Sequence, residues 1–273
     1  MRRLELCNPF GAPVFHAETV GSTMDVSRLL AHGGSLHGTV ICADFQETGK
    51  GRLPGRFWNA RRGENLLFTV LLRFPRTADI PGALTLRAGL AAALAIEDFA
   101  PALKNGAMIK WPNDVMLPTA AGSGAETRTF RKAVGILAEA DGGSVHLGIG
   151  VNVSQRDFPA GLREKVTSVA LASGSDTESA GRFVLLEKIL AFLRAELEPA
   201  NSGNANAWRE RIEARLYMRG ARADFAEGPA DLARPLAGTV VGVGPAGELL
   251  LVPDGETVAR GFVSGELSAQ KNC

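Results

Sequence analysis

The sequence predicts a chain in which helices and strands are interspersed, followed by a small second unit made of strands. Two observations support this prediction. Apolar residues recur at helical spacing in some segments and form short β-branched or apolar runs in others. From about Tyr217, short β-like runs alternate with Gly, Pro and Asp turns, a pattern typical of a meander that closes into a small barrel. The 273 residues allow one substantial core and this second unit, so we predict domains at residues 1–216 and 217–273.

The predicted elements follow from local signals along the chain. Ser22, Thr23 and Asp25 precede a short helix that ends before the two glycines at 33 and 34. Further helices are predicted, from apolar spacing, at residues 84–99, 183–197 and 208–216. Strands are predicted at residues 39–45, 65–74, 108–111, 115–117, 133–139 and 144–153, and in the second unit at 236–243, 248–252 and 257–262.

Composition and charge are those of an ordinary soluble globular protein. The chain is 45% hydrophobic and 22% charged, and its 30 basic and 29 acidic residues give a net charge of +1. This balance argues against a dedicated nucleic-acid binder. Cys7, Cys42 and Cys273 have no CxxC spacing, so neither a disulfide framework nor a zinc site is expected. We find no apolar signal peptide and no run of about 18 apolar residues, so we expect a cytoplasmic protein without a membrane partner.

The segment at residues 49–58, GKGRLPGRFW, places three cations among three glycines. Glycine lets the backbone approach a ligand closely, and flanking Lys and Arg side chains can then hold phosphate oxygens. The segment matches neither the Walker A pattern nor GxGxxG. On these grounds it is either an anion-binding loop or a solvated surface loop. Trp58 at its end could stack on a base or simply belong to the core.

Two further strings combine charge with a strand end. KWPND at residues 110–114 brings a lysine, an amide and a carboxylate together; it could be a plain β-turn, or Asp114 could orient a lysine or hold a magnesium-phosphate group. RKAVGILAE at residues 131–139 places Lys132 at the start of an apolar strand, where Gly135 permits close approach of a ligand.

Taken together and in this order, these strings resemble those of the biotin protein ligases (biotin–acetyl-CoA-carboxylase ligases). The resemblance covers residues 18–267, nearly the whole chain. Its matching elements are Ser22-Thr23, Gln46, GKGRLPGRFW at 49–58, KWPND at 110–114, RKAVGILAE at 131–139, GIGVNV at 148–153, Thr167-Ser168, and SGEL at 264–267.

The resemblance implies a two-step reaction with ATP and biotin as substrates and Mg²⁺ accompanying the ATP. The biotin carboxylate attacks the α-phosphate to give biotinyl-5′-AMP and pyrophosphate. A lysine of a biotin carboxyl carrier protein or domain then attacks the anhydride and releases AMP. The implied fold is α+β, a mixed sheet with packed helices related to class II aminoacyl-tRNA synthetases, plus a small C-terminal SH3-like β-barrel. A homodimer is common in the family.

The resemblance also implies a role for individual residues. Lys132 would bridge the biotin carboxylate and the α-phosphate, Arg52 would contact phosphate or carboxylate, and Asp114 would orient or help deprotonate the attacking lysine. These three are the candidate catalytic residues, and no metal-ligand set is expected on the protein. The candidate biotin-binding residues are Ser22, Thr23, Gln46, Gly49, Lys50, Lys132, Gly135, Gly148 and Gly150. The candidate ATP- or adenylate-binding residues are Arg52, Arg56, Trp58, Asn113 and Lys132.

The chain departs from the family pattern at a few positions. Met24 stands where Asn is common, Lys50 where Arg is usual, and Pro54 is an extra loop residue. An insertion at residues 118–130 separates KWPND from Lys132 by more than usual. Two other functions stay open: a lipoate or octanoate transferase of the same fold, and a biotin-binding sensor without turnover. The 21 residues before the Ser-Thr motif are too few for a winged-helix domain, so DNA binding is not expected.

Overall fold

The computed structural model describes residues 1–53, 55–58, 60–119, 129–175, 181–198, 207–228 and 234–269. Three subjects of the sequence analysis fall outside these ranges: Pro54, most of the insertion at residues 118–130, and Cys273. The expectations about them stay untested.

A mixed eight-stranded sheet forms the centre of the molecule. Its strands are β1 (Arg2–Leu4), β2 (Val14–Val20), β3 (Thr39–Gln46), β4 (Asn65–Arg73), β5 (Met108–Lys110), β6 (Asp114–Pro118), β7 (Phe130–Asp141) and β8 (Ser144–Asn152). Their order across the sheet is β1-β2-β3-β4-β8-β7-β6-β5. The sheet is mixed because β2 and β3 run parallel, whereas the other neighbouring pairs are antiparallel. The predicted mixed α+β architecture is therefore confirmed for this part of the chain.

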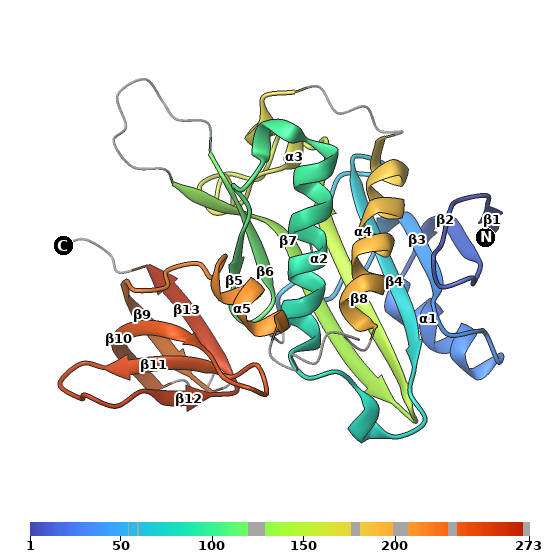
Figure 1. Ribbon diagram of the computed structural model, residues 1–273. Helices are drawn as coiled ribbons and strands as arrows, with labels where there is room; N and C mark the ends of the chain where they lie inside the picture. The colour runs from blue at the N-terminus through green and yellow to red at the C-terminus, as the bar shows by residue number, and fades with distance from the viewer. Residues whose placement is uncertain are drawn as a thin grey trace.

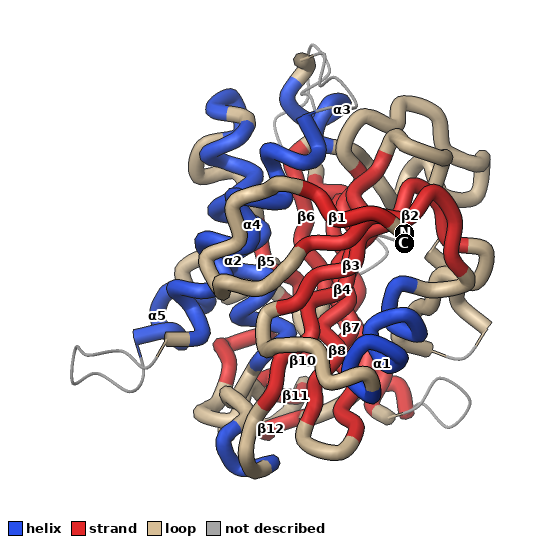
Figure 2. The backbone as a smooth tube through the Cα atoms, turned by 90° about the vertical axis from the view of Figure 1, so that its right-hand side faces the viewer, coloured by secondary structure: helices blue, strands red, loops and turns tan. Residues whose placement is uncertain are grey.

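Helices cover both faces of this sheet. Figures 1 and 2 show α2 (Leu84–Phe99) and α4 (Gly181–Leu197) side by side on one face, and α1 (Thr23–His32) on the other. The main core lies between the sheet and the α2–α4 pair. Two short helices, α3 (Val169–Ser173) and α5 (Ala207–Glu213), and two 3-10 turns, Thr77–Asp79 and Pro101–Leu103, complete the described helical segments.

One segment corrects the expectation about membrane spans. Thr77–Phe99 is long and apolar enough, with a mean hydropathy of 1.3, to cross a membrane by length and composition. The sequence analysis found no such stretch. Its apolar character has a packing explanation, since α2 lies between the sheet and α4 with residues such as Ala91 and Ile96 fully buried. A helix apolar on nearly all sides is what such a buried position requires.

The C-terminal strands form a second, five-stranded antiparallel sheet beside β5 and β6 (Figure 1). They are β9 (Arg222–Glu227), β10 (Arg234–Val243), β11 (Leu249–Pro253), β12 (Arg260–Phe262) and β13 (Gly265–Ala269), in the order β12-β11-β10-β9-β13. Three of the five were predicted. The strands β9 and β13, like β1 and β2, were not predicted: β9 and β13 alternate buried and less buried positions, but few of those positions carry a large apolar side chain, such as Phe225 in β9 and Leu267 in β13.

The second sheet shares a hydrophobic cluster with the first unit. Trp111, from the KWPND string, is buried among residues of both units, including Phe225, and its Nε1 donates a hydrogen bond to the carbonyl of Gly247 at 3.0 Å. Leu86 and Leu90 of α2 belong to the same cluster. The two predicted units are thus packed together through a common core, which fixes the second sheet next to the strings that carry the predicted chemistry.

Candidate active site

Most of the predicted site residues surround one pocket on the α1 face of the large sheet. It lies between the N-terminus of α1, the end of β3, the loop at residues 49–58, and strands β7 and β8. Its lining residues are Ser22, Thr23, Met24, Gln46, Lys50, Gly51, Arg52, Trp58, Phe68, Asn113, Lys132, Gly135, Ile136, Leu137, Gly148, Ile149 and Gly150. We call this the first pocket.

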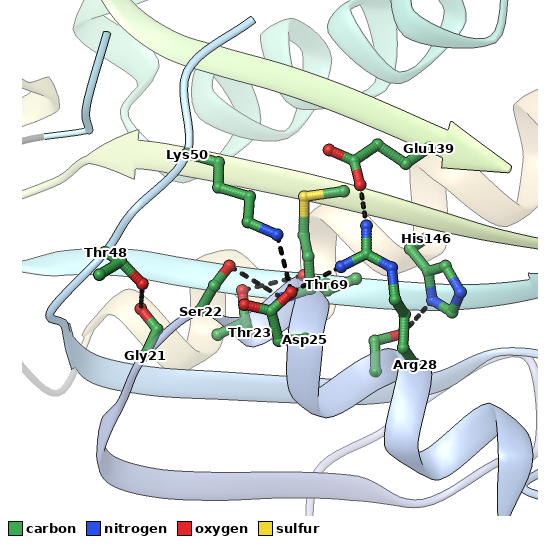
Figure 3. Close-up of polar contacts among 12 residues, drawn as sticks. Gly21, Ser22, Thr23, Asp25, Arg28, Thr48, Lys50, Thr69, Glu139 and His146 are labelled. Atoms are coloured by element: carbon green, nitrogen blue, oxygen red, sulfur yellow. Dashed lines mark hydrogen bonds and ion pairs between the residues drawn. The ribbon is translucent and has the colours of Figure 1, made fainter. Parts of the chain in front are cut away.

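Polar side chains at one end of the first pocket hold one another in place. The Gln46 amide oxygen accepts hydrogen bonds from the backbone N–H and the hydroxyl of Thr23, at 2.8 and 2.9 Å. Thr69 of β4 donates in turn to the Thr23 hydroxyl at 2.9 Å (Figure 3). Ser22 caps α1 by accepting from the Met24 N–H at 3.3 Å. Ser22, Thr23 and Met24 are all buried, so protein contacts fix this end of the pocket.

A stripe of glycines on β7 and β8 forms the floor of the first pocket. Gly135 and Gly150 are cross-strand partners, and Gly148 lies two residues before Gly150 on β8. A Cβ on Gly135 or Gly150 would lie 2.6 or 2.7 Å from the ring of Trp58, and one on Gly148 would lie 3.1 Å from the Met24 sulfur. Glycine is therefore required here because larger side chains would collide with the residues packed over the strands. The Trp58 indole lies across this stripe.

The loop at residues 49–58 has regular backbone hydrogen bonds. The N–H of Gly51 donates to the Arg56 carbonyl at 2.9 Å, and the N–H of Trp58 donates to the Gly49 carbonyl at 3.0 Å. A Cβ on Gly51 would lie 2.7 Å from the Arg56 carbonyl oxygen. The described part of the loop is therefore a closed hairpin-like turn.

Lys50 reaches from this loop to helix α1. Figure 3 shows its ammonium pointing toward the Asp25 carboxylate, and the distance to Oδ1 is 2.7 Å. Arg28, one turn further along α1, binds the same oxygen at 2.6 Å and also contacts Glu139 of β7. Lys50 lines the first pocket, and its charge is balanced by Asp25. The pair links the loop to α1.

A bulge in β7 determines where the Lys132 side chain lies. Val115 of β6 pairs with Val134, whereas the next residue, Met116, pairs with Lys132, so Ala133 is an extra residue in β7. Ala133 and Val134 are consequently both buried in the main core. Such a bulge shifts the alternation of a strand by one residue. Lys132 therefore shares a face with Gly135, and its Nζ lies 3.1 Å from the position of a Cβ on that glycine.

The first pocket meets a second, larger one along the residues that line both: Gly51, Arg52, Trp58, Asn113 and Lys132. The second pocket has a volume of about 460 Å³ and is lined by Gly51, Arg52, Leu53, Arg56, Phe57, Trp58, Lys110, Trp111, Pro112, Asn113, Asp114, Met116, Phe130, Lys132, Asn152, Phe158, Leu162, Lys165, Val166, Glu266 and Leu267. The Lys132 ammonium lies 2.6 Å from Asp114 Oδ1 and 5.6 Å from the centre of the Trp58 ring. A volume of this order is typical of small-molecule sites.

The KWPND string borders the second pocket. The Asn113 side chain donates to the Ile136 carbonyl at 2.8 Å, and the Ile136 N–H donates to the Asn113 carbonyl at 2.9 Å, which fastens the turn to β7. In the antiparallel register of β5 and β6, the backbone of Lys110 lies opposite that of Asp114. Burial lowers the pKa of Lys110 below its usual value, partly offset by the charge of Asp114. Within the described part of the chain, the Lys110 ammonium has no hydrogen bond or ion pair.

The second sheet closes the site from the other side. Arg52 donates to the Gly265 carbonyl at 2.9 Å, and Arg56 makes two hydrogen bonds to the Glu266 carboxylate at 2.5 and 2.9 Å. Both arginines line the second pocket, where β13 holds them; their predicted contact with ATP or adenylate stays a prediction. These partners were not predicted, because nothing in the local sequence connects residues more than 200 positions apart.

The structure thus brings the predicted residues together, with two refinements. Gly49 lines neither pocket. A Cβ on Gly49 would lie 3.0 Å from the Trp58 carbonyl oxygen, so glycine at this position lets the two arms of the loop pack closely. Lys110, Met24 and Phe57 line the pockets but were given no role. For Phe57, the signal available in the sequence was an aromatic residue inside a basic glycine loop. In the structure this side chain is 74% exposed.

Comparisons with known proteins give a consistent family of neighbours. No protein-family model matches the chain. The chain is 32% identical over 179 residues to the bifunctional ligase/repressor BirA of Bacillus spizizenii, a match covering 63% of this chain and 50% of that protein. It is 34% identical over 145 residues to a biotin–[acetyl-CoA-carboxylase] ligase of Mycobacterium tuberculosis, covering 51% and 48% of the two chains. The chain spans about half the length of these curated relatives.

The structural comparison covers almost the whole chain. A biotin protein ligase from Aquifex aeolicus, solved in complex with biotin and ATP, superposes with a TM-score of 0.73 over 95% of this chain and 99% of that one, at 24% identity. At this identity the likeness concerns the fold. The chain therefore has the fold of the biotin protein ligases, including the C-terminal sheet.

Proposed function

We propose that this protein is an ATP-dependent biotin protein ligase. It forms biotinyl-5′-AMP from biotin and MgATP and then transfers biotin to a lysine of a biotin carboxyl carrier protein or domain. The observation that carries the proposal is the meeting of two different pockets at Lys132: a narrow one with a polar end and a glycine floor, and a larger one rich in cations. The relatives and the shared fold support the same activity.

The first step requires two anions to approach each other. In our proposal the biotin ring system occupies the first pocket near Ser22, Thr23 and Gln46, with its carboxylate toward Lys132. ATP occupies the second pocket, with its α-phosphate on the other side of the same ammonium. An oxygen of the carboxylate forms a bond to the α-phosphorus, and the bond from that phosphorus to pyrophosphate breaks. Lys132 and Arg52 offset the repulsion and stabilise the charge that develops on the phosphoryl oxygens.

The second step requires a neutral amine. The acceptor lysine attacks the carbonyl carbon of the anhydride, AMP leaves, and the amine nitrogen must lose a proton. Asp114 lines the second pocket and lies 2.6 Å from Lys132, and this proximity to the lysine supports a role for its carboxylate in the second step. We assign Asp114 the role of orienting the acceptor amine and accepting its proton.

Mg²⁺ would reach the site bound to ATP. The described residues contain no group of three or more His, Cys, Asp or Glu side chains that could hold a metal by themselves. Asp114 is the carboxylate nearest the proposed phosphate position that could add a ligand. When bound, the ion would supply charge neutralisation for the phosphates.

For the fold, we further propose that the large sheet with its helices is of the class II aminoacyl-tRNA synthetase type. The C-terminal strands would close as an SH3-like barrel, with the boundary near Tyr217. The regular antiparallel order of β9 to β13 supports the barrel.

One experiment tests the activity. The protein is incubated with ATP, Mg²⁺ and labelled biotin, with and without a biotin carboxyl carrier domain, and labelled adenylate and labelled carrier are measured separately. We expect adenylate in both reactions and labelled carrier in the second. Adenylate without carrier labelling would favour the sensor function. Absence of adenylate, together with acyl transfer from an octanoyl thioester, would replace the proposal by the transferase alternative.

A further inference from the structure

A row of paired residues crosses the large sheet from the first pocket to the edge of the sheet. Gly150 of β8 pairs with Gly135 of β7, which pairs with Asp114 of β6. Asp114 pairs in turn with Lys110 of β5, the edge strand (Figure 1). Residues directly opposite each other on neighbouring strands project their side chains from the same face. The row therefore runs, on one face of the sheet, from the glycine floor of the first pocket to Lys110.

The charged part of this row has a lysine at each end. Lys132 shares the face with Gly135 because of the bulge in β7, and its ammonium lies 2.6 Å from Asp114 Oδ1. Neighbouring strands are about 4.8 Å apart, so the backbone of Lys110 on β5 lies roughly 10 Å from β7. Lys132 lines both pockets, whereas Lys110 lines the second alone. Lys110 is thus the cation at the end of the row away from the first pocket.

The proposed first step gives this row a direction. When a phosphoryl group is displaced, the attacking and leaving oxygens lie roughly in line on opposite sides of the phosphorus. In our proposal the attacking carboxylate comes from the first pocket, above β7 and β8, and the α-phosphate lies at Lys132. The leaving pyrophosphate therefore points away from the first pocket, along the row toward β6 and β5.

The ion pairs of the second pocket leave the Lys110 ammonium available. The Glu266 carboxylate is bound by Arg56 through two hydrogen bonds. The Asp114 carboxylate is bound by Lys132. Among the residues that the structure describes, the Lys110 ammonium has neither a hydrogen bond nor an ion pair, although it lines the pocket. A phosphate group in the pocket would meet this cation without having to displace a carboxylate.

Lys165 lines the same pocket and is likewise unpaired within the described ranges, but it lies on the other side of β7. The Lys132 N–H donates to the Lys165 carbonyl at 3.0 Å, and the Thr167 N–H donates to the Lys132 carbonyl at 2.9 Å. The N–H and C=O of one strand residue point to the same edge of the strand, so the segment around Lys165 lies along that edge and β6 along the other. Lys110 is therefore the unpaired lysine on the side toward which pyrophosphate would leave.

A structural role does not account for an ammonium at the position of Lys110. Burial lowers the pKa of this lysine, which means that its charged form is disfavoured there. The acids Asp114 and Glu266 act against this shift, and the cations Lys132 and Arg56 add to it, so the four partly offset one another. An apolar side chain of the same length would avoid the cost of burying a charge. A bound phosphate group would supply the missing negative charge.

We propose that Lys110 binds the pyrophosphate leaving group in the first step of the reaction. The proposal rests on the proposed ligase function and adds a catalytic residue to it. As the carboxylate oxygen bonds to the α-phosphorus, the bond from that phosphorus to the bridging oxygen breaks, and its electron pair stays on the bridging oxygen. The Lys110 ammonium donates a hydrogen bond to the departing pyrophosphate, with no proton transferred, and so stabilises the charge that develops there.

The test separates the terminal phosphates from the α-phosphate. ATP, inorganic pyrophosphate and AMP are each titrated calorimetrically into the full chain at neutral pH with Mg²⁺ present. AMP carries the α-phosphate alone, and pyrophosphate represents the leaving group alone. The variants are K110M, which removes the charge, and K110R, which keeps it. K165M removes the other unpaired lysine of the pocket, and K104M, the matched control, removes an exposed lysine that lines neither pocket.

We expect K110M to bind ATP and pyrophosphate about tenfold more weakly than the wild type, because one charge-assisted contact is lost. AMP binding should be unchanged, and K110R should keep most of the pyrophosphate affinity. K165M and K104M should bind pyrophosphate as the wild type does. Adenylate formation from ATP should slow on the order of tenfold in K110M. Transfer from isolated biotinyl-5′-AMP to a carrier domain, which involves no pyrophosphate, should keep its rate.

Three results would overturn the inference. Unchanged pyrophosphate affinity in K110M would show that Lys110 does not contact the leaving group. An equal loss of AMP affinity would place Lys110 at the α-phosphate. An equal loss of pyrophosphate affinity in K165M would show that the general charge of the pocket, and not the row across the sheet, attracts the phosphates. If the wild type forms no adenylate, the ligase function fails, and the titrations, which need no turnover, still decide whether Lys110 binds pyrophosphate.

Discussion

The two pockets that share Lys132 differ in the contacts that hold their polar and charged residues in place. The first is narrow and its polar groups, Thr23, Gln46 and Thr69, are hydrogen-bonded to one another in a buried environment. The second is larger, and two of its cations, Lys132 and Arg56, are paired with the carboxylates of Asp114 and Glu266. We infer that the first pocket selects by shape, because a Cβ added to Gly135 or Gly150 of its floor would collide with the Trp58 ring. The second selects by charge, because a phosphate group can replace or join the carboxylates already present.

Lys132 belongs to both pockets, so its removal should have the largest effect. We expect Lys132→Ala to lower the rate of adenylate formation by a factor on the order of 10²–10³, because one preorganised charge is lost where negative charge develops. Pyrophosphate release at saturating biotin and ATP measures it. Lys132→Arg keeps the charge and should retain more activity. A loss limited to the transfer step would contradict the position we assign to this residue.

A substitution in the glycine stripe tests selection by shape. In Gly150→Ala the new Cβ would lie 2.7 Å from the Trp58 ring. Overpacking of this kind costs about 1–3 kcal/mol, so biotin binding should weaken roughly 10- to 100-fold, whereas ATP binding should change little. Isothermal titration with each substrate measures both. Gly161→Ala, at a position with nothing within 4 Å, is the matched control. Equal weakening for ATP would argue against separate selection by the two pockets.

The pH dependence of ATP binding tests selection by charge. Burial lowers the pKa of Lys110 below its ordinary 10.5, so its positive charge is lost at a lower pH than that of an exposed lysine. We expect ATP affinity to fall about tenfold as pH rises through this lowered pKa, as one charge-assisted contact disappears. Lys110→Met should bind ATP weakly at all pH values and show no such fall. A pH profile shared by both proteins would exclude Lys110 from the phosphate site.

The same lysine makes a prediction about stability. Between the lowered pKa and the ordinary value of 10.5, the unfolded chain holds more of this proton than the folded chain. The free energy of unfolding attributable to Lys110 should therefore rise with pH across that window. Below the window its contribution is constant and unfavourable. Urea unfolding at several pH values gives the free energy of unfolding of the wild type and of Lys110→Met. The difference between these two free energies should narrow toward high pH.

The smallest effect is expected where the loop meets helix α1. Asp25→Asn removes the partner of Lys50, but the two side chains are 50% and 36% exposed, and such pairs contribute about 0.2–1 kcal/mol. We expect KM for biotin to rise two- to fivefold, with a smaller difference at high salt. Steady-state kinetics at two salt concentrations measures it. A loss of more than tenfold would mean that this pair holds the loop closed over the first pocket.

Much of the fold could be predicted from local signals. The apolar spacing of residues 84–99 predicted α2 with both of its ends, and the runs of β3, β4 and β8 were found to within about one residue. The strands β1, β2, β9 and β13 were missed because they are short or polar and are stabilised by their partners in the sheet. The basic glycine loop, KWPND and the Lys132 string were assigned to one site through their resemblance, in this order, to a known family, and the structure brings them around two adjoining pockets.

What the sequence by itself determined is the set of chemical groups available: glycines where backbone must lie close to a neighbour, three loop cations, and a carboxylate after a strand. Tertiary structure decided how those groups meet. The bulge at Ala133 turns Lys132 toward Gly135, and the ion pairs of Lys50, Lys132 and Arg56 join residues far apart in the chain. A bulge depends on the register of two strands, and an ion pair depends on where two segments pack. Neither is a property of any local stretch of sequence.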